Sequence, residues 1–188
     1  MYCGDEGVSR TGGASSEVPS RVIRKEVRVN ASIEKVWQAW TTSEGATKFF
    51  APEAKIDLIL GGRYELYFDL EAPKGSRGSE GCRVRSFLPL EMLSFEWNAP
   101  PEFPRVRREQ NKRHTWVVVQ FYSLGKNLTK VRLTHLGWRE NEEWEKVFQY
   151  FLRAWDVVLG RFEHTFMTGK PIDWESPYRP PEDRTYSI

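Results

Sequence analysis

The sequence has few cysteines, no long apolar run and almost no excess charge. Its two cysteines, Cys3 and Cys82, do not form a CxxC pair, which argues against a disulfide framework and against a cysteine-based zinc site. No stretch of about 18 uncharged apolar residues is present, so no membrane span is expected. The 28 basic and 26 acidic residues give a net charge of +2, and this balance provides no field that favours nucleic acid.

Motifs that hold a metal, a phosphate or a catalytic nucleophile are also missing from the sequence. The three histidines, His114, His135 and His164, fall on different predicted elements, so neither a metal site nor a cofactor is expected. The glycine-rich run over residues 75–81 lies between two predicted strands and lacks the helix that follows a phosphate loop. We interpret it as a hairpin connection.

Residues 1–20 are rich in Gly, Ser and Glu and show no hydrophobic periodicity, which predicts a disordered N-terminal tail. They also lack the apolar core of a secretion signal, and together with the low cysteine content this favours a cytoplasmic protein. The length of the remaining chain suits a single domain over residues 21–170. Residues 171–188, with several prolines, are expected to form an extended C-terminal tail.

Short segments in which apolar and polar residues alternate are typical of half-buried strands. The first covers residues 22–29, and Trp37 and Trp40 then recur at helical spacing after Ser32, which predicts two short helices between Ser32 and Phe49. Further strands separated by turn residues are expected at 54–60, 63–70, 80–87, 91–97, 115–124 and 128–136. Sequential hairpins of this kind predict an antiparallel sheet.

The strongest periodic signal starts at Asn141 and has a period of 3.6 residues. Its apolar stripe comprises Trp144, Val147, Phe148, Phe151, Trp155, Val158, Leu159, Phe162 and Phe166. Asn141 is a typical N-cap, and Gly169 with Pro171 ends the pattern. The resulting helix of roughly 40 Å is long enough to cross a whole sheet.

This order of elements, together with four segments, resembles the AHSA-type branch of the SRPBCC (START-like) superfamily, which is named after the activator of heat-shock protein 90 ATPase. The segments are residues 30–37, 57–64, 93–97 and 129–138. The resemblance implies an α+β helix-grip fold, in which a curved antiparallel sheet of six to seven strands wraps around the long C-terminal helix. Members of the superfamily carry lipids, sense hormones or act on polyketides in the cavity between sheet and helix, so a hydrophobic or aromatic small molecule is the expected ligand.

Strand and helix parity select the side chains that should face this cavity. They are Tyr64, Leu66, Phe68, Val84, Phe95, Trp97, Val119, Phe121, Leu133, His135, Phe151, Trp155 and Leu159. His135 is the one ionisable group that we assign to the inner wall, where it is either a hydrogen-bonded core residue or a functional group. If His135 is functional, Glu96 or Glu80 on nearby strands could orient it, but parity places Glu96 on the outer face, which weakens any pairing with His135.

Two alternatives to simple ligand binding remain open. One is a cyclase-, aromatase- or hydrolase-like enzyme that uses His135 with Tyr64 or a cavity water as general acid and base. The other is a stress-related chaperone partner that uses either the convex face of the sheet or the basic segment 105–113. That segment lies within a Pro-rich stretch over residues 98–114 that is expected to be an exposed loop. A homodimer is also predicted, because Trp116, Val118, Tyr122 and Leu124 share the outer face of one strand and need a cover.

Overall fold

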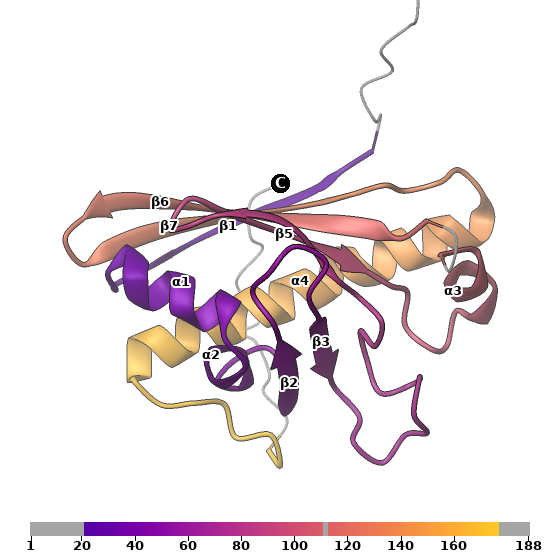
Figure 1. Cartoon of the computed structure of the whole chain (residues 1–188), viewed down its shortest axis with the longest axis horizontal. Helices are drawn as coiled ribbons and strands as arrows, with labels where there is room; N and C mark the ends of the chain where they lie inside the picture. Colours follow the sequence, from indigo (N-terminus) through magenta and orange to yellow (C-terminus); the bar gives the residue numbers. More distant parts are fainter. Residues whose placement is uncertain (1–20, 111–112, 177–188) are drawn as a thin grey trace, which may run out of the picture.

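The computed structural model describes residues 21–110 and 113–176. Its elements, in order, are β1 (Ile23–Val29), α1 (Ile33–Thr41), α2 (Ser43–Thr47), β2 (Glu53–Ile56), β3 (Tyr64–Tyr67), β4 (Val84–Leu88), β5 (Met92–Trp97), α3 (Pro104–Gln110), β6 (Thr115–Gly125), β7 (Leu128–Leu136) and α4 (Glu142–Thr168). The sheet forms one layer, and α4 with α1, α2 and the β2–β3 hairpin forms the other (Figure 1). The predicted α+β helix-grip architecture is confirmed.

The seven strands found in the described residues divide into two sheets rather than one, which corrects the predicted single sheet of six to seven strands. Five strands pair antiparallel in the order β1-β7-β6-β5-β4, and β2 pairs only with β3. The loop between β3 and β4 occupies the β3 edge, where the Ser79 amide donates to Leu66 O at 2.9 Å. An isolated bridge from Arg63 to Arg83 and backbone hydrogen bonds of Gly61 and Gly62 with Val84 join the hairpin to the start of β4.

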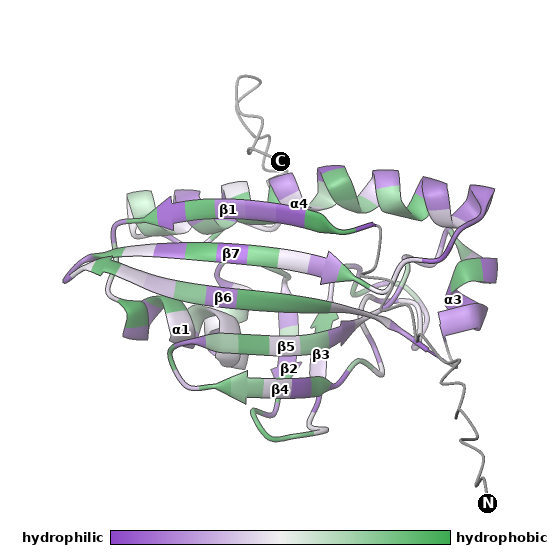
Figure 2. Ribbon diagram, turned by 90° about the horizontal axis from the view of Figure 1, so that it is seen from above, coloured by the Kyte–Doolittle hydropathy of each residue, from purple (hydrophilic) through white to green (hydrophobic). Residues whose placement is uncertain are grey.

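The strands of the five-stranded sheet lie side by side in Figure 2, and buried residues alternate with less buried ones along β6 and β7. Val117, Val119 and Phe121 are buried on the inner face of this sheet, and their register partners on β7 are His135, Leu133 and Val131. The parity assigned from the sequence is thus confirmed for these strands. The inner face supplies the sheet half of the core.

Helix α4 begins and ends where the sequence predicts. The side chain of Asn141 accepts a hydrogen bond from the Trp144 amide at 2.9 Å, and Gly169 ends the helix with a φ of 69°. This left-handed conformation favours glycine because it lacks a Cβ atom. The apolar stripe from Trp144 to Phe162 is buried against the sheet.

The segment 98–114 is not the continuous exposed loop that its prolines and charges suggest, because it contains the helix α3. Pro104 occupies the first turn, where its missing N–H costs nothing, and Val106 and Gln110 are buried. A helix of only 7 residues shows too few periodic positions for the sequence pattern to reveal it. Lys112 and part of the basic segment lie outside the described residues.

The start of the C-terminal tail packs against α2. The Ile172 amide donates to Lys48 O at 2.8 Å, and the Trp174 indole donates to Thr47 O at 2.9 Å. The predicted N-terminal tail and residues 177–188 lie outside the described residues, so the predicted domain limits remain predictions. Within the described parts of the chain, none of the helices has the length and apolar character that a membrane crossing needs.

Candidate ligand-binding pocket

An open pocket of about 810 Å³ lies between α4, the loop after β3 and the segment that follows β5. Its lining includes Phe68, Trp97, Phe151 and Trp155 from the residues that the sequence predicted. Phe50, which follows α2, completes the aromatic part of the wall. Phe50 was missed because it lies beyond the periodic patterns, although the adjacent Ala51-Pro52 marks the turn that brings it under the sheet.

The aromatic side chains of the pocket contact one another closely. Trp97 stacks on Phe50 with ring centroids 5.6 Å apart and lies 5.4 Å from Trp155. Phe68, at 43% exposure, extends the group toward solvent and meets the Trp97 ring at 6.3 Å. Phe68 is the exposed ring of this group, whereas Phe50, Trp97, Phe151 and Trp155 are buried behind it. An aromatic lining of this kind is suited to an apolar or aromatic ligand.

The other residues predicted to line a cavity belong to the packed core and do not line this pocket. They are Tyr64, Leu66, Val84, Phe95, Val119, Phe121, Leu133, His135 and Leu159, all of them buried. Tyr64 stacks on Phe95 with centroids 3.9 Å apart, and its hydroxyl donates to Trp40 O at 2.9 Å. The large rings therefore fill the middle of the space between sheet and helix, which leaves the pocket at one side of α4.

His135 is held in a single protonation state by its neighbours. The Trp155 indole N–H donates to Nδ1 of His135 at 3.1 Å, so Nδ1 carries no proton. The other ring nitrogen, Nε2, lies 2.8 Å from Thr115 Oγ1, and the neutral ring donates there. A second proton on the ring would face the indole N–H, and burial likewise keeps the pKa of His135 well below its ordinary value of 6.5.

This lowered pKa predicts a loss of stability in mild acid. The unfolded chain binds a proton at His135 near pH 6.5 and the folded chain does not, so stability is complete above that pH and falls as the pH decreases toward the folded pKa. The expected loss is up to about 1.4 kcal/mol per pH unit. Urea denaturation at pH 7, 6 and 5 measures it. A His135→Gln variant should lose most of this slope, and an equal slope in both proteins would contradict the assignment.

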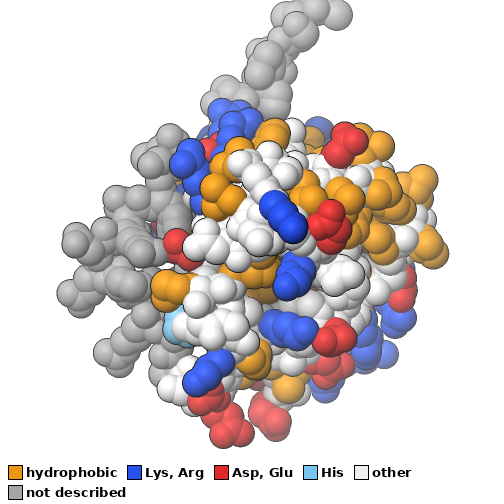
Figure 3. Space-filling model, turned by 90° about the vertical axis from the view of Figure 1, so that its left-hand side faces the viewer, with side chains coloured by type: hydrophobic (Ala, Val, Ile, Leu, Met, Phe, Trp, Pro, Cys, Tyr) orange, Lys and Arg blue, Asp and Glu red, His pale blue; other side chains and the backbone are white. Residues whose placement is uncertain are grey.

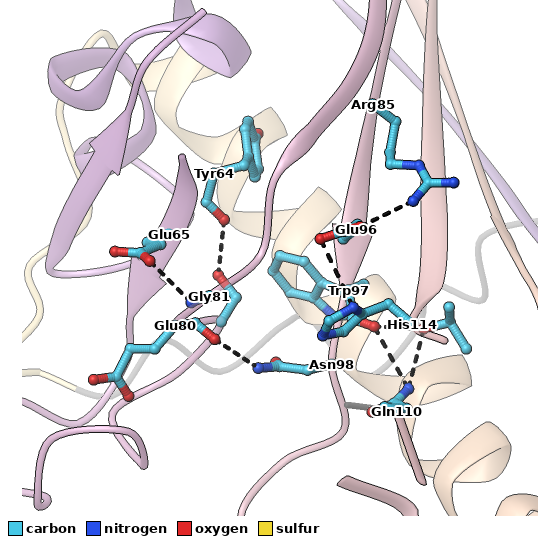
Figure 4. A network of polar contacts seen from close by, with 12 residues as sticks. Tyr64, Glu65, Glu80, Gly81, Arg85, Glu96, Trp97, Asn98, Gln110 and His114 are labelled. Atoms are coloured by element: carbon cyan, nitrogen blue, oxygen red, sulfur yellow. Dashed lines mark hydrogen bonds and ion pairs between the residues drawn. The ribbon is translucent and has the colours of Figure 1, made fainter. Parts of the chain in front are cut away.

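Hydrogen bonds from α3 and from the segment after β5 hold the pocket mouth in place. Arg107 donates to the carbonyl oxygens of Ala99 at 3.0 Å and Gly75 at 2.7 Å, which belong to segments on two sides of the pocket. The side chain of Asn98 donates to Glu80 O, as Figure 4 shows. Arg107 is thus a structural residue rather than part of a free basic surface.

The buried Gln110 anchors the other end of α3 beneath β5. Its amide group lies between Trp97 O, at 3.5 Å, and Thr115 Oγ1, at 3.4 Å (Figure 4). Thr115 in turn contacts His135, so hydrogen bonds connect α3 to the indole of Trp155 in the pocket wall. The position of the wall therefore depends on this buried polar chain.

Glu96 lies on the outer face of the sheet, as predicted. It accepts a hydrogen bond from Arg85 at 2.9 Å and lies 3.7 Å from Nδ1 of His114 (Figure 4). Glu80 accepts from the Gly75 and Arg77 amides of its own loop. Neither carboxylate contacts His135 in these hydrogen bonds, which leaves His135 without the proposed acidic partner.

Groups that could hold a metal do not gather in the part of the chain that the structure describes. Cys82 is buried, and burial raises the pKa of its thiol. Burial likewise raises the pKa of Tyr64, whose hydroxyl is already engaged by a backbone oxygen. Neither Cys82 nor Tyr64 lines the pocket.

Comparison with known proteins places the chain in a family. The sequence model described as "Activator of Hsp90 ATPase homolog 1-like protein" matches residues 30–167. The chain belongs to this family. The resemblance identified in the sequence is thereby confirmed over most of the domain. No curated protein matches the sequence significantly.

Solved structures similar to this chain share its fold at low sequence identity. A Mesorhizobium loti protein is 17% identical with a TM-score of 0.62, and the match covers 79% of this chain and 98% of that one. The Aha1 dimer from Colwellia psychrerythraea is 21% identical with a TM-score of 0.59 and coverages of 80% and 98%. An Hsp90 activator from Plasmodium falciparum is 19% identical with a TM-score of 0.57 and coverages of 80% and 97%.

Proposed function

We propose that this protein binds an apolar or aromatic small molecule in the pocket beside α4. The observation that carries the proposal is the group of six aromatic side chains that border one open volume of about 810 Å³, namely Phe50, Phe68, Trp97, Tyr150, Phe151 and Trp155. Pockets for small ligands commonly measure about 300–1,000 Å³ and are lined mainly by apolar and aromatic groups. The size and the lining of this pocket both fit that class.

Filling the pocket with a larger side chain tests the proposal. Ala154 lines the pocket on α4 and is only partly buried, so Ala154→Phe places a ring in the ligand space. We expect quenching of tryptophan emission by naphthalene derivatives in the parent protein and at least about tenfold weaker binding in the variant, because the ligand loses apolar contact area.

The control is Gln149→Phe, which adds the same ring to an exposed position of α4 outside the pocket. This variant should keep the parent affinity. Equal affinity of the Ala154→Phe variant, at unchanged helicity and melting temperature, would show that the ligand binds elsewhere.

The enzymatic alternative gains no support from the geometry. His135 is completely buried and is absent from the pocket lining, and both of its ring nitrogens are engaged. Tyr64 donates its hydroxyl to a backbone oxygen in the core. A general acid and base must reach the substrate, and neither group borders the ligand space.

The chaperone alternative is favoured by the family description and by the Hsp90 activator from Plasmodium falciparum among similar structures. Two basic side chains on α3, Arg105 and Arg108, are exposed, and Arg105 forms a surface ion pair with Glu143 at 3.2 Å that an acidic partner would replace. Hsp90 would then lose affinity for an Arg105→Glu/Arg108→Glu variant, whereas naphthalene binding would stay the same. Unchanged Hsp90 affinity of this variant in a titration would exclude Arg105 and Arg108 as the surface that binds Hsp90.

A second copy of the chain remains a candidate partner for the outer sheet face. Leu124 is 46% exposed there, and the solved relative from Colwellia psychrerythraea is a dimer. Part of the face is already covered, since Lys130 Nζ lies 4.6 Å from the Tyr122 ring centre. At the end of the molecule that Figure 3 shows, which is a different surface from the outer sheet face, basic and acidic side chains are intermingled. A monomeric mass in concentrated light scattering would exclude the dimer.

A further inference from the structure

We infer that the ligand of this pocket is an amphipathic anion, such as an aromatic carboxylate, whose charged group is bound by Arg153. The inference rests on the proposed function and names the class of ligand. Three arginines line the pocket, Arg77, Arg153 and Arg161, against two carboxylates, Asp69 and Glu102. A basic margin beside an aromatic wall suits a molecule with an apolar body and a negative end.

Two of the three carboxylates on or beside the pocket are engaged by other groups. Asp69 uses Oδ1 to accept hydrogen bonds from the Glu71 and Ala72 amides, both at 3.1 Å. Asp156, three residues beyond Arg153 on α4, binds Lys25 at 2.8 Å. Glu102, at the exposed margin, contributes to the raised pKa of Tyr150, after burial of the phenol itself. These carboxylates form no ion pair with Arg153.

The three guanidinium groups differ in their availability. Arg77 donates its Nε to Ala72 O at 3.0 Å, which ties this side chain to its own loop. Arg161 lies over the Trp174 ring at 5.1 Å. Arg153 is exposed, and among the described residues it has no hydrogen bond or ion pair. It is therefore the donor that an incoming anion can engage without breaking an existing contact.

The spacing along α4 places the charges beside the apolar surface. Arg153, Val157 and Arg161 follow one another at intervals of four residues and all line the pocket, so they share one helix face. At 1.5 Å per residue the two arginines are about 12 Å apart along the axis. Trp155 and Val158 lie on the adjoining, buried face. A flat ligand in the pocket can direct its carboxylate toward this margin.

A matched pair of ligands separates the charge from the apolar body. Naphthoate and naphthalenemethanol have the same ring system, and calorimetry measures the affinity of each for the full chain. We expect naphthoate to bind about tenfold more tightly, because a charge-assisted hydrogen bond at a partly exposed site contributes modestly. Arg153→Met should abolish this preference and leave naphthalenemethanol binding unchanged. Arg24→Met, an exposed arginine on β1 outside the pocket, is the control and should keep the preference.

The outcomes distinguish this inference from the proposed function. Equal affinities for both ligands, or a preference for naphthoate that survives Arg153→Met, would overturn the anion inference and leave the pocket intact as a binding site. Binding of neither ligand would count against the proposed function itself. A preference that disappears in Arg153→Met and persists in Arg24→Met supports the assignment.

Discussion

Replacing His135 by alanine is expected to lower the free energy of unfolding by about 3 kcal/mol. The ring is completely buried and contacts Phe151 and Trp155, with centroids 5.0 and 5.8 Å away. Its removal leaves a cavity and deprives the Trp155 indole of its acceptor at Nδ1. Both effects lower the free energy of unfolding. Urea denaturation at about pH 7.5, where the histidine ring is unprotonated in both the folded and the unfolded chain, measures the loss.

His114→Ala is the matched control for this substitution. His114 is half-exposed, and its ring lies 3.7 Å from Glu96 on the outer face. Surface substitutions of this kind usually change stability by less than about 0.5 kcal/mol. Similar small losses in both variants would mean that His135 is not the centre of a buried hydrogen-bonded chain.

Asp156→Ala is expected to lower the free energy of unfolding by about 3 kcal/mol through the charge that it leaves behind. The Lys25 side chain points from β1 toward α4 and is only 6% exposed, while that of Asp156 is 28% exposed. Nζ of Lys25 contacts both carboxylate oxygens, at 2.8 and 3.1 Å. Without them a buried ammonium group remains unpaired between the sheet and the helix.

The double variant Lys25→Met/Asp156→Leu shows whether the unpaired charge is the cause. Removing both charges and filling the space with apolar groups should restore most of the lost stability. Glu142→Ala, which breaks the exposed pair with Lys146, should cost less than about 0.5 kcal/mol. A double variant as unstable as Asp156→Ala would contradict this explanation.

The long regular elements were predictable because their side chains repeat with one period over many residues. The stripe from Trp144 to Phe162 defined α4, and its caps Asn141 and Gly169 set both ends. Strict alternation likewise defined β6 and β7 and the face that meets the helix. Periodicity reports which side of an element is buried, and in these elements that was enough.

The position of the pocket could not be predicted in the same way. Parity assigns Tyr64 and Phe95 to the interior, but it does not reveal that their rings stack at 3.9 Å and fill it. The pocket depends on irregular segments, the loop after β3 and the segment after β5, which are held by Arg107 and Asn98. Such contacts join residues far apart in the sequence and leave no periodic signal.

Intermolecular nuclear Overhauser effects between bound naphthoate and the protein test the central claim most directly. The account predicts contacts from the naphthalene protons to the side chains of Trp97, Trp155 and Val158, which border the proposed ligand space. Contacts instead to Ser32 and Phe166, in the groove between α1 and the end of α4, would contradict it.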